Sequence, residues 1–257
     1  MAKQVIEATV LEQKELIPGV FDLLLQAEPI AAQAVPGQFV SVYTKNAAKL
    51  LPRPISLCGI DKDLGTLRLV YRVTGDKTGT EEFSTYQTGD SVRIAGPMGN
   101  GFPILEGKTM VIGGGIGVPP MLELAKNLPG DVTAVMGYRN ADTFLADEFQ
   151  NVAHLEIATE DGSIGTKGNV LDAIREKHLQ ADVIYACGPT PMLRAIKAYA
   201  AENHIRCYLS LEERMACGVG ACLACVCQSK DVDAHSHVHN KRVCKDGPVF
   251  AAEEVEL

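Results

Sequence analysis

The sequence predicts an α/β plus β protein, in which a small antiparallel β-barrel precedes a doubly wound parallel sheet and a short cysteine-rich module. Three observations carry this prediction. Short apolar strands alternate with turn signals through the first part of the chain. Units of strand, glycine turn and helix repeat through the middle, and four cysteines gather near the end. The predicted domains are residues 1–103, 104–210 and 211–257.

Length and charge agree with this division and exclude several functions. The chain has 257 residues, a length that suits about two domains and a small additional module, and 46% of its residues are hydrophobic, so a core can form. The net charge is -8, so the chain lacks the excess of basic residues with which proteins bind nucleic-acid phosphates, and a nucleic-acid-binding function is disfavoured. No apolar run of about 18 residues is present and no secretory signal precedes the first strand, so we expect a cytoplasmic protein without membrane spans.

The barrel is predicted from short strand-like runs with turn residues between them. Four of these runs are residues 21–25, 37–43, 67–73 and 91–95. At this density, and with no long helical pattern, they favour a small antiparallel barrel or a sandwich.

Three stretches of the barrel are candidates for binding a phosphate or a flavin. A guanidinium fork stands beside a rigid turn and a hydroxyl in Arg53, Pro54, Ile55 and Ser56, and an aromatic face stands beside a second cation in Val70, Tyr71 and Arg72. The loop that contains Gly79 and Thr80 can turn its backbone N–H groups toward phosphate. Each stretch also has an ordinary interpretation, respectively a surface turn, a core tyrosine and a hairpin.

The second predicted domain opens on a strand, a glycine turn and a helix. Its turn contains Gly113, Gly114, Gly115 and Gly117, and prolines follow where a missing N–H costs little. A helix N-terminus reached through glycines is suited to a dinucleotide pyrophosphate. The turn departs from the strict G-x-G-x-x-G fingerprint, because Val118 and Pro119 stand where a later glycine is expected.

Two later turns lie at the carboxyl ends of predicted strands, where open α/β sheets bind ligands. One contains Asp161 and Gly162, and the other contains Gly188 and Pro189. Cys187 immediately precedes the second turn and is either an inert core thiol or a group that contacts a bound ring.

The cysteine-rich module has the spacing of an iron–sulfur site. Cys217, Cys222 and Cys225 follow the C-x4-C-x2-C pattern of plant-type ferredoxins, and Cys244 supplies a fourth thiol. The residues between the first three are small, which lets the backbone wrap closely around a cluster. The spacing therefore predicts a 2Fe-2S cluster.

Other interpretations of these side chains stay open. Zinc is disfavoured because structural zinc sites usually pair two C-x2-C knuckles, whereas Cys244 stands alone. Disulfides are disfavoured because they are rare in a reducing compartment. Cys227 is interpreted as a buried or spare thiol. Alternate histidines at 235, 237 and 239 suggest a metal site, but on a polar strand they would share one solvated face.

These motifs, in this order along essentially the whole chain, resemble the ferredoxin reductase superfamily. The tail from Glu212 to Cys225, together with the segment from Val243 to Phe250, looks like that of the electron-transfer subunits of type B dihydroorotate dehydrogenases. This resemblance implies FAD at Arg53–Ser56, Val70–Arg72, Gly79 and Thr80, a 2Fe-2S cluster on the four cysteines, and NAD as terminal acceptor.

The resemblance also implies a partner, since the three modules leave no region to oxidise dihydroorotate. That chemistry would belong to an FMN-containing catalytic subunit, in a heterotetramer. Two alternatives remain at this point. One is a flavin and iron–sulfur reductase subunit of a sulfite reductase, hydrogenase or transhydrogenase complex, and the other is a non-enzymatic assembly module that binds zinc.

Overall fold

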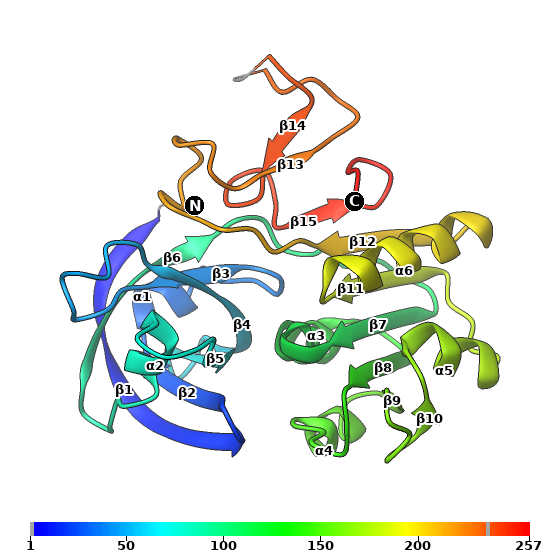
Figure 1. Cartoon of the computed structure of the whole chain (residues 1–257), viewed down its shortest axis with the longest axis horizontal. Helices are drawn as coiled ribbons and strands as arrows, with labels where there is room; N and C mark the ends of the chain where they lie inside the picture. The colour runs from blue at the N-terminus through cyan, green and yellow to red at the C-terminus, as the bar shows by residue number, and fades with distance from the viewer. Residues whose placement is uncertain (1–2, 235–236) are drawn as a thin grey trace.

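The computed structural model describes residues 3–234 and 237–257 of the chain. A barrel and an α/β lobe lie side by side, and the C-terminal segment runs along one side of both (Figure 1). Within the described residues, no helix is long and apolar enough to cross a membrane.

The first lobe is a closed antiparallel barrel with the strand order β1-β2-β5-β4-β3-β6, which confirms the barrel and excludes the sandwich. Apolar side chains such as Leu25, Val40 and Ile94 alternate inward and fill its interior. Two short helices, α1 (Glu28–Ala31) and α2 (Gly79–Phe83), lie between strands. The strands are β1 (Gln4–Ile17), β2 (Val20–Gln26), β3 (Phe39–Val42), β4 (Arg53–Asp61), β5 (Thr66–Arg72) and β6 (Ser91–Met98).

The second lobe is a sheet with the order β10-β9-β8-β7-β11-β12-β15, parallel except at its β15 edge. All residues of β7 are buried, as expected for a central strand covered on both faces. The strands are β7 (Thr109–Gly114), β8 (Val132–Tyr138), β9 (His154–Thr159), β10 (Thr166–Lys167), β11 (Val183–Cys187), β12 (Arg206–Ser210) and β15 (Val249–Ala251).

Helices cover both faces of this sheet, so the doubly wound prediction is confirmed. Residues of α3 and α4 belong to one apolar cluster, and residues of α5 and α6 belong to another. The bounds are η1 (Gly115–Gly117), α3 (Val118–Asn127), α4 (Ala146–Gln150), α5 (Val170–Glu176) and α6 (Thr190–Glu202).

The order of the strands reverses between the neighbours β7 and β11. From β7 the chain continues to β8 and β9 on one side, and from β11 it continues to β12 on the other side. The helices that follow them, α3 and α6, lie on opposite faces, so a crevice opens at the carboxyl ends of the two strands. Gly113 lies in register with Cys187 at this point. A Cβ atom on Gly117 would come within 2.3 Å of the Cys187 carbonyl oxygen, so only glycine fits there.

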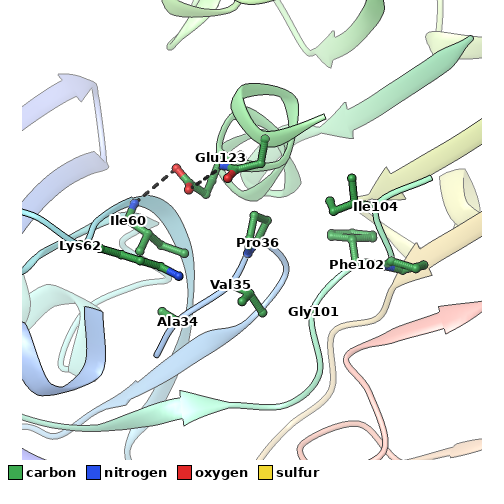
Figure 2. Close-up of a pocket in the computed structure, with 11 residues that line it drawn as sticks. Ala34, Val35, Pro36, Ile60, Lys62, Gly101, Phe102, Ile104 and Glu123 are labelled. Carbon is green, nitrogen blue, oxygen red and sulfur yellow. Dashed lines mark hydrogen bonds between the residues drawn. The ribbon is translucent and has the colours of Figure 1, made fainter. Parts of the chain in front are cut away.

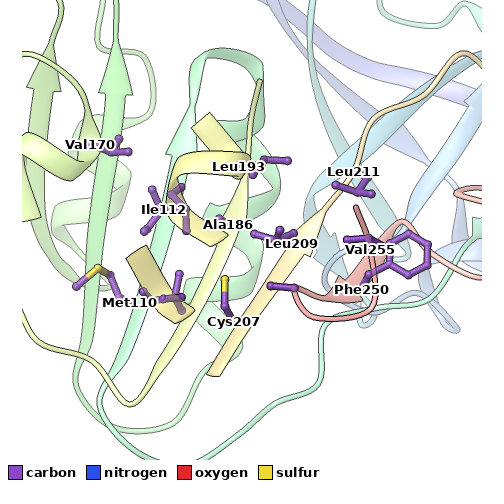
Figure 3. Packing of buried hydrophobic residues seen from close by; sticks show 14 of the residues in the cluster. Met110, Ile112, Val170, Ala186, Leu193, Cys207, Leu209, Leu211, Phe250 and Val255 are labelled. Carbon is purple, nitrogen blue, oxygen red and sulfur yellow. The ribbon is translucent and has the colours of Figure 1, made fainter. Parts of the chain in front are cut away.

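The C-terminal segment forms a hairpin of β13 (Val226–Gln228) and β14 (Asn240–Arg242), and then returns to the large sheet. β15 pairs antiparallel with β12, and Phe250 and Val255 pack in the same apolar cluster as Ile112 of β7 (Figure 3). The boundary at residue 211 therefore remains a prediction, since strands on its two sides share one sheet.

An ion network joins the barrel to the α/β lobe. Arg68 of β5 donates from Nε to Asp22 Oδ1 over 2.9 Å and from Nη2 to Glu148 Oε1 over 2.8 Å. Asp22 belongs to β2 and is 6% exposed, whereas Glu148 belongs to α4. One guanidinium thus bridges the two lobes.

Candidate functional site

The main candidate site is a cavity of about 500 Å³ between the barrel, the glycine turn and the strand that leads into the cysteine module. Ile116 of η1 and the segment 210–215 form its α/β side. Of the residues predicted from the barrel sequence, those that line it are Arg53, Pro54, Ile55, Ser56, Val70, Tyr71, Arg72 and Thr80.

Antiparallel pairing explains why two separate barrel motifs meet in this cavity. β4 begins at Arg53 and its neighbour β5 ends at Arg72, so both guanidinium groups lie at the same end of the barrel. Thr80 is buried, and its hydroxyl accepts a hydrogen bond from the Thr74 N–H over 3.1 Å. This wall offers two cations, hydroxyl groups and apolar surface, which suit a phosphate-bearing ring system.

Gly79 is not part of the lining but contacts a residue that is. A Cβ atom at this position would come within 2.8 Å of Arg53 Nε, so a larger residue would push the guanidinium aside. Arg53 also donates to the carbonyl of Leu51, which further fixes its direction.

A second cavity, of about 380 Å³, lies beside the crevice of the sheet. Gly188 and Pro189 line it, and Leu211, Glu212 and Glu213 line both this cavity and the first. The predicted glycine turn after β7 contributes Ile116 to the first cavity, while Gly114 lies against Pro189. The two cavities therefore adjoin at the end of β12.

Cys187 and the turn at Asp161 lie apart from these linings. Cys187 is 1% exposed, and burial raises the pKa of its thiol, so it is a neutral group behind the cavity wall. Its sheet neighbour Ser210 does line the cavity. Asp161 is exposed, and hydrogen bonds from Ser163 hold its pKa below the usual value. Neither Asp161 nor Gly162 lines the two cavities.

Sequence reasoning missed the cavity residues from Ser210 to Met215. They follow directly from β12, a parallel strand, and the rule that ligands bind at the carboxyl ends of such strands would have found them. Phe39 and Pro248 were also missed, because no local pattern connects them with the cavity.

The four predicted cysteines form two pairs. Cys222 lies close enough to Cys217 to lower its pKa, and Cys225 lies close enough to Cys244 to raise its pKa. Backbone N–H groups also reach the sulfur atoms, from Val219 to Cys217 Sγ over 3.4 Å and from Cys244 to Cys225 Sγ over 3.4 Å. The charge of Cys217 also acts on Cys244, so the two pairs are neighbours.

The two pairs differ in electrostatic environment. Desolvation opposes ionisation of Cys217, but hydrogen bonds from Val219, Cys222 and Ala221 outweigh it and lower the pKa to about 6. Burial, reinforced by Cys225, raises the pKa of Cys244 to about 12. Cys217 and the exposed Cys222 are thus the accessible pair, and the other pair is buried.

This donor set fits a 2Fe-2S cluster better than zinc. In a 2Fe-2S cluster each iron takes two thiolates, whereas structural zinc takes four ligands around a single ion. Two adjoining thiol pairs match the arrangement that two irons require.

The remaining sulfur and imidazole candidates lie outside this arrangement. Cys227 is buried, and its Sγ donates to the carbonyl of Lys241, as expected of a spare thiol. His239 shares a hydrogen bond with the Lys230 carbonyl through Nδ1 over 2.8 Å. His235 lies outside the described residues, so the histidine hypothesis stays untested.

A further cavity, of about 600 Å³, lies beside α3 and the connection between the lobes (Figure 2). Glu123 points to it and is 6% exposed, and its Oε2 accepts from the Ile60 N–H over 3.3 Å. Ile60 is near the end of β4, whereas Arg53 of the main cavity begins that strand, so the two cavities are separate.

Two family models match parts of the chain. Residues 212–256 match the iron-sulfur cluster binding domain of dihydroorotate dehydrogenase B. Residues 111–198 match the oxidoreductase NAD-binding domain. The first region contains all four paired cysteines, and the second contains the glycine turn and Gly188.

Similar proteins extend the likeness over the whole chain. Dihydroorotate dehydrogenase B (NAD(+)) electron transfer subunits from Listeria monocytogenes and a Geobacillus strain are 46% and 44% identical, each covering 98% of both chains. A solved NADH-dependent reduced ferredoxin-NADP oxidoreductase is 29% identical, with a TM-score of 0.86 over 97% of this chain and 89% of that chain. A ferredoxin reductase in carbazole 1,9a-dioxygenase shares the fold at 20% identity, with a TM-score of 0.67 over 80% and 67%.

Proposed function

This chain belongs to the family of dihydroorotate dehydrogenase B (NAD(+)) electron transfer subunits, and from that premise we propose how its residues divide the work. The protein transfers electrons to NAD+ in pyrimidine biosynthesis, using FAD and an iron–sulfur cluster. The electrons come from a catalytic dihydroorotate dehydrogenase subunit that is its partner.

FAD is assigned to the cavity between the barrel and the glycine turn. Arg53 and Arg72 neutralise the pyrophosphate, since each guanidinium can present parallel N–H donors to phosphate oxygens. Ser56 and Thr80 supply hydroxyl groups, and the apolar part of the wall receives the ring. Gly79 leaves room for Arg53 to take up its position.

NAD is assigned to the crevice of the sheet and to the second cavity. Gly113, Gly114, Gly115 and Gly117 let the dinucleotide approach the backbone before α3, and Gly188 and Pro189 form the opposite side. Cys187 supports this junction from behind, and Asp161 and Gly162 are assigned to the outer part of the nucleotide site. Because Glu212 lines both cavities, it marks the place where the two ligands meet.

The 2Fe-2S cluster is assigned to Cys217, Cys222, Cys225 and Cys244. The N–H groups directed at the sulfur atoms stabilise thiolate charge and orient the ligands. When bound, the cluster carries one electron at a time, whereas the flavin exchanges single electrons on one side and hydride on the other.

One observation carries the proposal, namely that the FAD cavity and the cysteine site share a wall. Met215 lines the cavity, and Cys217 follows two residues later. A Cβ atom on Gly218 would lie 3.2 Å from Met98 Sδ of β6, so the cysteine loop packs directly on the barrel. The chain therefore holds two redox sites side by side.

The partner supplies the chemistry that this chain lacks. We place dihydroorotate oxidation on an FMN-containing catalytic subunit, with both subunits doubled in a heterotetramer. We place the complex in the cytoplasm, because none of the eight cysteines forms a disulfide and reduced cysteines persist in reducing compartments. Equilibrium sedimentation of the co-expressed subunits tests the stoichiometry, and cell fractionation tests the location.

A visible spectrum of the anaerobically purified chain, with iron, sulfide and flavin analysis, tests the cofactor assignments. We expect a flavin band and a broad cluster absorbance, both bleached by NADH and more slowly by NADPH. A colourless protein that contains zinc would overturn the proposal.

A further inference from the structure

Arg242 is the last residue of β14 and stands two positions before Cys244. Its side chain is only 7% exposed, which is unusual for an arginine and requires partners for its charge. The guanidinium has five N–H donors in a fixed plane, so its contacts define one orientation.

Those contacts reach three separate segments of the C-terminal module. Nε donates to Asp246 Oδ2 over 2.8 Å, and Nη2 donates to Asp233 Oδ1 over 3.3 Å. Nη1 donates to the carbonyl oxygen of Gly220 over 3.3 Å. Asp246 follows Cys244, Asp233 lies between β13 and β14, and Gly220 lies between Cys217 and Cys222.

The contact with Gly220 matters because its loop has no regular structure of its own. Residues 215–224 form neither strand nor helix, so their position depends on contacts with other segments. Cys244, by contrast, is held by its N–H bond to Cys225 and by the hairpin beside it. Arg242 therefore connects the loop of the exposed cysteine pair with the segments around the buried pair.

The charge of Arg242 also acts on the site. The hydrogen bond that the guanidinium donates to the Asp246 carboxylate, together with the negative charges of Asp246, Asp233 and Cys244, raises the pKa of Arg242, while desolvation opposes this rise. A buried cation two positions before Cys244 stabilises negative charge on the cysteine ligands beside it.

We propose that Arg242 is a positioning residue for the iron–sulfur site, which holds the Cys217–Cys222 loop against the Cys225–Cys244 pair through the Gly220 carbonyl and keeps a positive charge beside Cys244. This inference rests on the assignment of the cluster to the four cysteines. Hydrogen bonds and charges around the ligands set how firmly a metal is held and at what potential it is reduced.

Two variants separate the geometric role from the charge. Arg242→Gln removes both the planar set of N–H donors and the positive charge. Arg242→Lys keeps the charge, but a single ammonium group cannot donate to Gly220, Asp233 and Asp246 at the same time. Lys241→Gln is the matched control, because this neighbouring cation pairs instead with Glu254 Oε2 over 2.9 Å.

The first measurement is the rate at which an iron chelator bleaches the oxidised protein. We expect Arg242→Gln to lose iron about tenfold or more faster than the unaltered chain, which is the scale of outer-shell substitutions at metal sites. Arg242→Lys should also lose iron faster, while its cluster potential in an anaerobic redox titration stays close to that of the unaltered chain. Arg242→Gln should show a lowered potential, and Lys241→Gln should match the unaltered chain in both.

Hydrogen exchange of residues 218–222 in the cluster-free chain gives a readout that needs no cofactor. We expect faster exchange in both Arg242 variants. Unchanged exchange, iron loss and potential in Arg242→Gln would overturn the inference. Absence of iron from the unaltered chain would instead overturn the cluster assignment, and NADH oxidation with a dye confirms that each variant has folded.

Discussion

Cys217 and Cys227 show how neighbouring thiols on one short segment acquire different properties. Cys217 is half-buried, paired with Cys222 and surrounded by N–H donors that lower its pKa to about 6. Cys227 is buried, and desolvation raises its pKa to about 11. The Sγ of Cys227 donates to the carbonyl of Lys241, and Cys227 lies outside the two cysteine pairs, so its place in the fold separates it from the four predicted ligands.

Replacing Cys217 by Ser should therefore remove the cluster absorbance and stop electron transfer from the partner. NADH oxidation with a dye should persist at more than about half of its original rate, because the FAD cavity keeps all its lining residues. Cys227→Ser is the control and should keep iron, sulfide and both activities. Loss of the dye activity in Cys217→Ser would show that the cluster supports the fold instead.

Glu123 is a buried carboxyl group beside the cavity of Figure 2. Burial raises its pKa, although hydrogen bonds from Asn127 and the Ile60 N–H act in the opposite direction. The folded state thus holds the proton more tightly than the unfolded state, so the free energy of unfolding falls as pH rises from about 4.3 through the folded pKa.

Glu123→Gln cannot ionise and still offers an oxygen to the Ile60 N–H, so we expect it to lose this pH dependence. Relative to the unaltered chain it should gain stability at pH 7 and not at pH 4, as measured by urea denaturation. Glu106→Gln replaces an exposed acid and should leave the profile unchanged. A constant difference between Glu123→Gln and the unaltered chain at all pH values would contradict this assignment.

At this scale, the sequence predicts residues that carry their own chemical signature. The cysteines and Arg53–Ser56 could be recognised because spacing and residue type restrict their use. Glu123 and Arg242 could not, because burial of an ordinary glutamate or arginine depends on segments that meet only in the folded chain. Nothing near them in the sequence distinguishes them from exposed residues.

Elements of the two lobes meet at Arg68, whose guanidinium contacts Asp22 of β2 and Glu148 of α4. Hydrogen bonds from Arg68 lower the pKa of Glu148, although partial burial opposes them. A lowered folded pKa gives a contribution to stability that is fully present above about 4.3 and is lost as pH falls through the folded pKa.

Arg68→Met should lower the free energy of unfolding at pH 7 by about 3 kcal/mol, because it leaves Asp22 buried without its main partner. The loss should shrink as pH falls through the folded pKa of Glu148 and that carboxylate becomes protonated. Lys14→Met is the control, since Lys14 lies 3.7 Å from Asp22 but is 54% exposed, and it should cost less than about 1 kcal/mol. Urea denaturation of both variants at several pH values makes the comparison, and equal losses would refute the role of Arg68.

Strands and helices in which apolar residues recur at a regular spacing were predicted well, and very short elements were not. The strands at 67–73 and 91–95 and the helix that follows the first glycine turn appear where the sequence indicates them. The sheet position of β15 could not be predicted, because three residues carry no period and their pairing with β12 is decided by distant contacts.

At the scale of the whole molecule, two adjoining cavities and a cysteine site are the places that we propose for three cofactors, and the chemistry of the substrate belongs to another chain. The cavities described line up with flavin and dinucleotide motifs, and the cysteines adjoin the first of them. Fold and cofactors were both predicted from the order of these motifs, whereas the shared wall formed by residues 210–215 became visible only in three dimensions.

The isolated chain should therefore oxidise NADH with artificial electron acceptors and form no orotate from dihydroorotate and NAD+. With the catalytic subunit added, NAD+-dependent orotate formation should be at least about 100-fold faster than with the catalytic subunit alone, since binding brings the redox sites within reach of each other. Chromatographic detection of orotate makes the measurement, and the catalytic subunit alone is the control. Orotate production by the isolated chain would contradict the division of labour.

The pairing of β15 with β12 has a consequence for how electrons move. Because the strand after Cys244 is part of the nucleotide-binding sheet, the cysteine module cannot swing on a tether as a mobile carrier does. The tunnelling distance from cluster to flavin is then established when the chain folds and does not depend on diffusion of a domain. Electron transfer between the two should accordingly be insensitive to solvent viscosity.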